Sequence, residues 1–391
     1  MWAARIATLV IVPLLSIVGQ EVWDLTVHLR YRSAPQSPSE TMRAVRYSRH
    51  GQPRDVLEIV PDAPQPLTPA GPDMLVVKVA GAALNPVDFK MQRNAQPDAM
   101  IPKPKIPGCD VSGTVVDAGP GVHGFKVGDE VFGMLPIVGS GWGSLAEYVA
   151  AEAACFAKAP SSIPLVDAAA LPLVGLTVMQ VCHQAGLVYQ EEPRPHGVAL
   201  VQAASGGVGT FAVQYLRNVL KFGQVLGTAS LANDQFVSSL GVTRAIDYHS
   251  EDFESAAQKA GGADLVIDPM AWKYMNRTLR GSMLRPGAKY CHIMSSDWAP
   301  NDAESSPLTA LQGPLLKWQS WIAHLVNPST QQVFSTAVRP DGASLAMLAT
   351  FVDAGMIKPV IDRVFDGLDS AVEALGYLEQ GHAKGKVLVR L

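Results

Sequence analysis

The sequence has few aromatic residues, which occupy 7% of its 391 positions, and few charged ones, which occupy 17%. Its 31 basic and 35 acidic side chains leave a formal net charge of −4, so the sequence shows no broad basic surface for nucleic acid. The hydrophobic share of 48% argues against disorder and allows a chain of this length to form two domains with buried cores.

Cysteine is also scarce. The chain has four cysteines, and they are far apart: Cys109, Cys155, Cys182 and Cys291. The closely paired spacing of a structural zinc site is missing, and so is the density of a secreted disulfide scaffold. We therefore expect free, buried thiols in a reducing compartment.

A long hydrophobic run is missing too, because residues 6–18 fall short of the roughly 20 apolar residues that cross a bilayer. Apolar positions continue beyond this run, but Glu21 and Asp24 interrupt them. Three interpretations compete: a cleaved targeting peptide, a retained anchor and a helix docked on a partner protein. We favour retention, with residues 1–32 forming a hydrophobic helix that associates with a membrane or a membrane-protein complex. Residues 33–39 then resemble a short flexible linker.

The rest of the chain shows two patterns of secondary structure. Short Val-rich segments bounded by Gly and Pro predict a mostly β domain, with strands over residues 42–47, 75–80, 111–118 and 130–135. Strand and helix patterns then alternate, which predicts a doubly wound parallel sheet with strands over residues 198–202, 224–228, 244–246, 264–267, 289–294 and 333–337. Two helices and two strands follow, the strands at residues 359–365 and 386–390. The sequence thus divides into an N-terminal helix and linker, a first β part, a Rossmann domain and a C-terminal part, with boundaries at residues 1–41, 42–160, 161–338 and 339–391.

The most informative motif is the run Ala203-Ala204-Ser205-Gly206-Gly207-Val208-Gly209. It follows a predicted buried strand and leads into a predicted helix over residues 208–221, the context in which a glycine turn binds a dinucleotide diphosphate. We expect the cofactor to contact the loop through Ala203, Ser205, Gly206, Gly207, Val208 and Gly209.

The next strand indicates which cofactor binds. An NAD site carries Asp or Glu about 20 residues beyond the glycine loop, to hold the ribose hydroxyls. Here the strand ends in Thr228-Ala229-Ser230, which leaves room for a 2′-phosphate and favours NADPH over NADH, although Asp234 is close by. Tyr248, just past the third strand, either packs on the adenosine ribose or is a half-buried core tyrosine.

Seven segments together resemble the medium-chain dehydrogenase/reductase superfamily, on its quinone-oxidoreductase branch. The glycine run continues as TFAVQ at residues 210–214, and the other six are ALNPVD (83–88), IPGCDVSG (106–113), FKVGDEV (125–131), AAALP (168–172), GMIKPV (355–360) and GHAKGK (381–386). The resemblance covers the chain from about residue 42 to its end. It implies an α/β fold in which a GroES-like, mostly β catalytic domain is built from both ends of the chain and a Rossmann domain is inserted between them.

The resemblance also implies site residues. Asn85 and Asp88 match cleft positions that orient substrate and nicotinamide, although an Asx-type turn around Pro86 explains them equally simply. Thr177 matches a position near the nicotinamide, with a helix-buried threonine as the alternative. Lys386 matches a cleft-side lysine, whereas a lysine before a terminal strand is usually solvated.

Zinc enzymes of the family have Gly-His-Glu where this chain has Gly108-Cys109-Asp110, so we expect no metal. Other departures bear on turnover. The tyrosine proton donor of enoyl reductases is missing from residues 89–105, and bulky residues replace expected glycines at residues 268–272 and 295–298.

Two functions remain open. The first is an NADPH-dependent reductase of a quinone or enone, attached to the mitochondrial inner membrane as in the relatives linked to quinone metabolism. The second is a weakly active or inactive accessory subunit of a mitochondrial respiratory membrane complex that keeps the nucleotide-binding fold. The amphipathic insertion at residues 308–326 covers either a sheet edge, a homodimer interface or a membrane surface. A homodimer is among the assemblies that the sequence allows.

Overall fold

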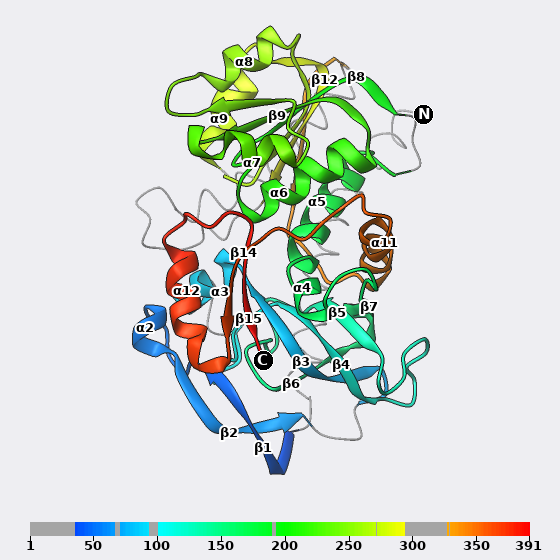
Figure 1. Ribbon diagram of the computed structural model, residues 1–391, viewed down its shortest axis with the longest axis vertical. Coiled ribbons are helices and arrows are strands. Elements are labelled where there is room, and N and C mark those ends of the chain that lie inside the picture. The colour runs from blue at the N-terminus through cyan, green and yellow to red at the C-terminus, as the bar shows by residue number, and fades with distance from the viewer. Residues whose placement is uncertain are drawn as a thin grey trace, which may run out of the picture.

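The computed structural model describes residues 36–66, 71–93, 101–189, 193–270, 272–293, 327 and 329–391. Figure 1 shows two lobes, with the middle of the sequence in the upper one and both ends of the described chain in the lower one. The predicted N-terminal hydrophobic helix and the amphipathic insertion at residues 308–326 lie outside the described residues.

The lower lobe contains an antiparallel-rich sheet. Within the described ranges its strand order is β14 (Ile361–Asp366), β15 (Lys386–Arg390), β3 (Met74–Leu84), β4 (Asp110–Ala118), β5 (Glu130–Met134) and β7 (Phe156–Lys158), with β6 (Tyr148–Glu152) also paired to β3. Strands from the two ends of the chain meet where β15 runs antiparallel to β3, with Val387 opposite Leu84. This sheet is the predicted GroES-like domain, completed by the C-terminal segment.

Short helices border this sheet: α2 (Pro53–Val56), α3 (Pro86–Gln92), α4 (Leu165–Ala168), α11 (Gly342–Asp353) and α12 (Ala371–Glu379). Of these, α3 begins directly after β3, because Asn85 is extended and Pro86 takes the first helical position, where a missing N–H costs nothing. The end of β3 and the start of α3 therefore place Asn85 and Asp88 at the top of the lower lobe.

The linker prediction is wrong for residues 36–39. They belong to β1 (Gln36–Arg46), which pairs antiparallel with β2 (Glu58–Pro66) so that Gln36 lies opposite Pro66. Ser and Pro at residues 33–39 gave a linker-like composition, but backbone hydrogen bonds to a distant partner strand decide the local structure.

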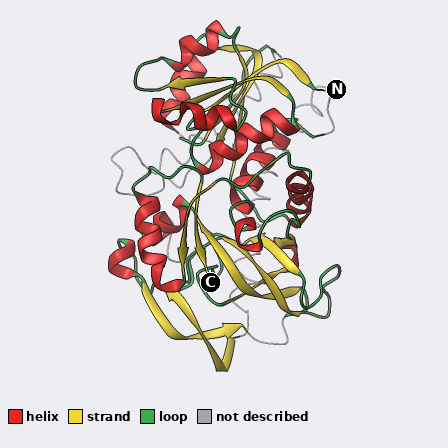
Figure 2. Ribbon diagram, in the orientation of Figure 1, coloured by secondary structure: helices red, strands yellow, loops and turns green. Residues whose placement is uncertain are grey.

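The upper lobe is the predicted Rossmann domain. In the described chain its parallel sheet has the order β10 (Arg244–Asp247), β9 (Phe222–Ala229), β8 (Arg194–Val201), β11 (Ala263–Asp268), β12 (Leu284–Ile293) and β13 (Gln332–Thr336). Helices α5 (Pro172–Gln184), α6 (Gly207–Gln214), α7 (Asp234–Ser239), α8 (Phe253–Lys259) and α9 (Trp272–Arg280) accompany it (Figure 2). Residues 198–201 are fully buried, as expected for a parallel strand covered on both faces.

One helix differs from its predicted range. The helix predicted over residues 208–221 is α-helical as far as Gln214 and continues as a π-helical turn, Tyr215–Val219.

Among the described residues, the stretch Leu165–Gln184 is long and apolar enough to cross a membrane, but 72% of its apolar window is buried. Its Leu176 and Cys182 pack in the same core as Phe211, so it acts as a core segment between the two sheets.

Candidate functional site

The glycine loop joins the carboxyl end of β8 to α6. Ala203 has a positive φ of 49°, and Gly206 is extended at the N-cap of α6 with φ −81° and ψ 174°. A Cβ on Gly209 would lie 2.1 Å from the carbonyl oxygen of Ala203, so this position requires glycine. By contrast, a Cβ on Gly206 meets nothing closer than 3.5 Å.

Hydrogen bonds from the neighbouring strand fix the loop. The N–H of Ala203 donates to Thr228 Oγ1 at 2.9 Å, and the N–H of Ala204 donates to the Thr228 carbonyl at 2.9 Å. The Thr228 hydroxyl donates in turn to Gln202 Oε1 at 2.8 Å. The first-turn N–H groups of α6, at Gly207 and Val208, have no place in the helical ladder and are suited to an anionic diphosphate.

Ser230 and Tyr248 lie together at the ends of β9 and β10. The Tyr248 N–H donates to the carbonyl of Ala229 at 3.3 Å, which places Tyr248 beside Ser230. Its side chain is 53% exposed, so Tyr248 is not a core residue. Both side chains are accessible at the edge of the sheet where a Rossmann domain receives the adenosine half of a dinucleotide.

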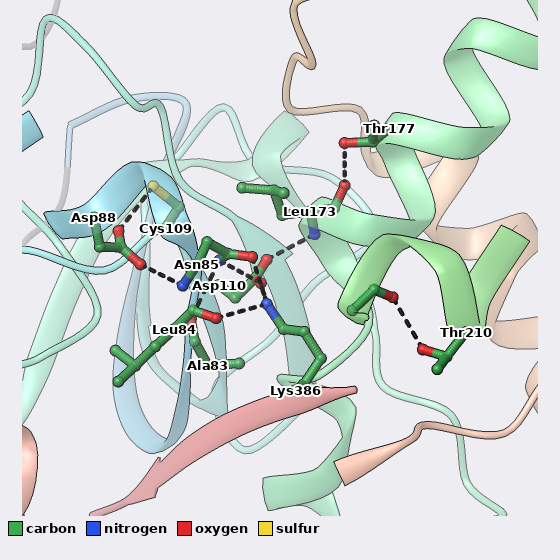
Figure 3. A network of polar contacts seen from close by, with 11 residues as sticks. Ala83, Leu84, Asn85, Asp88, Cys109, Asp110, Leu173, Thr177, Thr210 and Lys386 are labelled. Carbon is green, nitrogen blue, oxygen red and sulfur yellow. Dashed lines mark hydrogen bonds and ion pairs between the residues drawn. The ribbon is translucent and has the colours of Figure 1, made fainter. Parts of the chain in front are cut away.

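A buried polar network lies where β3, α3, β4 and β15 meet, and Figure 3 shows its contacts from close by. The ammonium of Lys386 donates to the Leu84 carbonyl at 3.0 Å, to Asp110 Oδ2 at 3.0 Å and to Asn85 Oδ1. Asn85 Nδ2 donates to the same carboxylate oxygen of Asp110 at 2.9 Å. Lys386 is only 4% exposed, so the alternative interpretation, a solvated lysine before the terminal strand, is wrong.

Asp88 lies in the first turn of α3 and accepts the N–H of Asn85 at 2.8 Å on Oδ2. Its other oxygen accepts the thiol of Cys109 at 3.5 Å. Burial raises the pKa of Asp88 to about 6, against the opposing influence of the Asn85 N–H and the Lys386 ammonium. Asn85 and Asp88 therefore serve both the helix start, as the turn interpretation expected, and the polar network.

Thr177 is also buried, and its hydroxyl donates to the carbonyl of Leu173 one turn earlier in α5, at 2.7 Å. The N–H of Leu173 donates to Asp110 Oδ1 at 2.7 Å. Thr177 is thus a helix-buried threonine one turn from the network rather than a member of it.

The two lobes meet at Lys386. The N–H of Gly385 donates to the carbonyl of Ser205 at 3.0 Å, and Gly385 forms a parallel bridge with Gly206. A Cβ on Gly207 would lie 3.2 Å from Lys386 Cδ. The segment Gly385-Lys386 therefore contacts the glycine loop of the upper lobe while its ammonium holds the polar network of the lower lobe.

Comparison with known proteins agrees with this architecture. Residues 71–161 match the family described as alcohol dehydrogenase GroES-like domain, and residues 240–389 match the family described as zinc-binding dehydrogenase. A 2-methylene-furan-3-one reductase of Solanum lycopersicum is 32% identical over 362 residues, which cover 90% of this chain and 79% of that protein. A chloroplast envelope quinone oxidoreductase homolog of Arabidopsis thaliana is 33% identical over 353 residues, which cover 89% and 98%.

The chain belongs to the medium-chain dehydrogenase/reductase superfamily, on its quinone-oxidoreductase branch.

Two further relatives extend the family assignment. The mitochondrial NAD(P)H oxidoreductase RTN4IP1 of Danio rerio is 29% identical over 388 residues, which cover 95% of this chain and 96% of that protein. A quinone oxidoreductase structure from Coxiella burnetii superposes with a TM-score of 0.70 at 27% identity and covers 90% of this chain and 100% of that one. These relatives support a nicotinamide-dependent oxidoreductase with a small-molecule substrate, and they include both mitochondrial and chloroplast proteins.

The donor set does not fit the zinc that the description of one matched family implies. No group of three or more His, Cys, Asp or Glu side chains in the described part of this medium-chain reductase could hold a metal ion. Asp110 is already paired with the Lys386 ammonium, and Cys109 with Asp88. The expectation that the protein works without a metal stays a prediction.

Sequence reasoning missed Asp110 as a site residue. Asp110 is fully buried and links β4, α3, α5 and β15, but the sequence shows only one acid before an apolar strand. A charge in a segment that must be buried is itself a signal, because a buried carboxylate needs a partner.

Asp268, at the end of β11, was noted only as a departure from the family pattern. It accepts the Tyr290 hydroxyl at 2.6 Å and the Met270 N–H at 2.8 Å, and burial raises its pKa to about 6. It is therefore a buried carboxylate at the carboxyl edge of the Rossmann sheet, in addition to Asp88 and Asp110 in the lower lobe.

Proposed function

We propose that this protein is a zinc-independent, NADPH-dependent reductase of a quinone or enone acceptor, associated with the mitochondrial inner membrane. The observation that carries the proposal is the contact of Gly385-Lys386 with the glycine loop on one side and with Asn85 and Asp110 on the other. It brings the residues suited to a dinucleotide next to the polar cluster of the catalytic domain.

NADPH, when bound, supplies the hydride that reduces the acceptor. The glycine loop holds the diphosphate through the N–H groups at the start of α6. Lys386 donates to three acceptors, which uses all three of its N–H bonds, so it acts as a positioning residue and not as a proton donor. Asn85 and Asp110 fix its ammonium, and with it the alignment of the catalytic domain on the nucleotide loop.

Support for NADPH comes from the end of β9. No acid stands at residues 228–230 to accept the two ribose hydroxyls, and Ser230 and Tyr248 border the position that a 2′-phosphate would take. The NADPH-dependent alkenal/one oxidoreductase of Arabidopsis thaliana, 31% identical over 367 residues, uses the same nucleotide by its name.

The acceptor class follows from the relatives. Their names specify a furanone, alkenals and enones, and quinones, all of which have a conjugated carbonyl that takes a hydride. The mitochondrial assignment rests on the likeness to RTN4IP1, whereas other relatives are chloroplast proteins. Subcellular fractionation tests the organelle, and carbonate extraction tests the association with a membrane.

The test is NADPH oxidation by the full chain with a quinone series and with an enone. We expect saturable turnover that Gly206→Asp abolishes, because its carboxylate repels the diphosphate without a steric clash. Gly206→Ala is the matched control for the added side chain. Tight NADPH binding with no acceptor reduced would overturn the reductase assignment.

One observation favours the second candidate, a nucleotide-binding accessory subunit with little turnover. Asn85, Lys386, Asp110 and Asp88 are hydrogen-bonded to one another, so in this arrangement none of them is left to polarise an acceptor. NADPH binding without turnover, with co-purification of the chain in a large membrane assembly, would select this candidate.

A further inference from the structure

The adenosine edge of the Rossmann sheet carries one basic residue. After β9 the sequence runs Ser230-Leu231-Ala232-Asn233-Asp234-Gln235, and after β10 it runs Tyr248-His249-Ser250-Glu251. Neither segment has a lysine or arginine. Within these two described segments, the imidazole of His249 is therefore the one side chain that can become a cation and meet a ribose 2′-phosphate placed between them.

The pairing of β10 with β9 places His249 close to the end of β9, where the adenosine ribose is expected. The end of β10 pairs with the end of β9, with Asp247 opposite Ala229, and the Tyr248 N–H donates to Ala229. The His249 ring lies against the Tyr248 ring, with centroids 4.3 Å apart. Both side chains are exposed, and so is Leu231 across the gap, so these groups are available to a ligand.

Charged groups lie close to the His249 imidazole. Asp247 accepts the Ser250 hydroxyl at 2.8 Å and the His249 N–H at 3.2 Å, and these bonds hold the pKa of Asp247 below its usual range. Its carboxylate is thus ionised beside His249. Two other acidic residues are close in the fold. Glu251 forms an ion pair with Arg244, and Asp234 is the first residue of α7, which packs on β10.

We propose that His249 is the specificity-determining residue for NADPH over NADH, and that protonation of its imidazole strengthens binding of the 2′-phosphate. The inference rests on the proposed function, because it concerns the same nucleotide. An imidazole titrates between about pH 5 and 8. Preference for NADPH is then pH-dependent, unlike that of a site built on arginine or lysine, which stay charged over this range.

The test is calorimetric titration of the full chain with NADPH and with NADH near pH 7 and near pH 8.5, where the 2′-phosphate is mostly doubly ionised because its second pKa is about 6. We expect NADPH to bind about twofold more tightly at the lower pH, because an ordinary imidazole is only partly protonated there, and NADH to bind equally at both. In His249→Ala the pH effect should vanish, and in His249→Lys tight NADPH binding should persist at both values.

His196→Ala is the matched control, because His196 is an exposed histidine at the opposite, amino-terminal edge of the same sheet. It should keep the wild-type pH dependence. If His249→Ala discriminates between the two nucleotides as the wild type does, or keeps the pH effect, the assignment of His249 is wrong while the proposed function stands. If no variant and no wild-type sample binds either nucleotide, the proposed function itself fails.

Discussion

The ammonium of Lys386 and the carboxylate of Asp110 form a buried ion pair, 3.0 Å long, between the first residue of β15 and the first residue of β4. These residues are 276 positions apart in the sequence. The pair therefore joins the C-terminal strand to the first part of the catalytic domain, directly below the nucleotide loop.

Removing one partner of this pair should destabilise the fold. Lys386→Met leaves the buried carboxyl of Asp110 without its cation, for which we expect a loss of about 3–5 kcal/mol in the free energy of unfolding. Lys386→Met with Asp110→Asn should recover part of that loss, because no buried charge remains. Urea unfolding measures both. The exposed neighbour Lys384→Met is the control and should change stability by less than about 0.5 kcal/mol. Equal losses at the two lysines would contradict the role of the pair.

Two glycines of the loop should respond differently to a methyl group. Gly209→Ala forces a Cβ against the Ala203 carbonyl at 2.1 Å, so we expect a loss of about 1–3 kcal/mol in stability and weaker NADPH binding. Gly206→Ala meets only ordinary contacts and should leave stability unchanged. Thermal unfolding with and without NADPH separates the two effects, and similar behaviour of both variants would disprove the loop geometry.

The buried carboxyl of Asp88 should make stability depend on pH. Because burial raises its pKa from 3.8 to about 6, its contribution is favourable below pH 4 and is lost as the pH rises through 6. At about 1.4 kcal/mol per pKa unit, the loss is roughly 3 kcal/mol. Asp88→Asn should therefore gain stability relative to the wild type between about pH 4 and 6.

Urea unfolding of both proteins across this range measures the difference. The comparison of the variant with the wild type is needed because Asp247, Asp252 and Asp353 have lowered pKa values, which make both proteins more stable as the pH rises. This common effect cancels in the difference between their free energies of unfolding. A constant difference from pH 4 to 7 would show that Asp88 titrates normally.

Substitutions at Thr177 test whether this residue acts in the cleft or only stabilises its helix. The family resemblance implies that Thr177 lies near the nicotinamide, and for that role we expect Thr177→Val to lower kcat/KM about tenfold, the effect of losing one hydrogen bond of about 1.4 kcal/mol. The free energy of unfolding should change by less than about 1 kcal/mol, because only one intrahelical hydrogen bond is lost. Thr177→Ser should restore the rate. An unchanged rate in the valine variant would leave Thr177 as a helix residue only.

Much of the fold was predictable from pattern. The alternation of strand and helix after residue 161 and the glycine turn between β8 and α6 are local signals, and both appear in the structure. Residues 36–39 were assigned wrongly because their strand depends on pairing with β2, which no local composition encodes. The π-helical turn after Gln214 has no sequence signal that we used either.

For the site, the motifs predicted Asn85, Asp88 and Lys386 each as a cleft residue, and their roles there stay a prediction. The structure places the three in one polar network. Asp110 stands between them, and the contact of Gly385 with Ser205 joins segments 180 residues apart, so only the fold reveals either. The sequence equally could not show that Lys386 uses all its hydrogen bonds internally, which changes its role from chemistry to positioning.

The most direct test is a single-turnover, stopped-flow measurement with the full chain, NADPH deuterated at C4 and a quinone in excess. The account predicts one exponential loss of reduced nicotinamide, slowed by the deuterium and absent in Gly206→Asp. An acceptor-independent signal, or loss of NADPH that is the same in Gly206→Asp, would contradict hydride transfer from a nucleotide held by this loop.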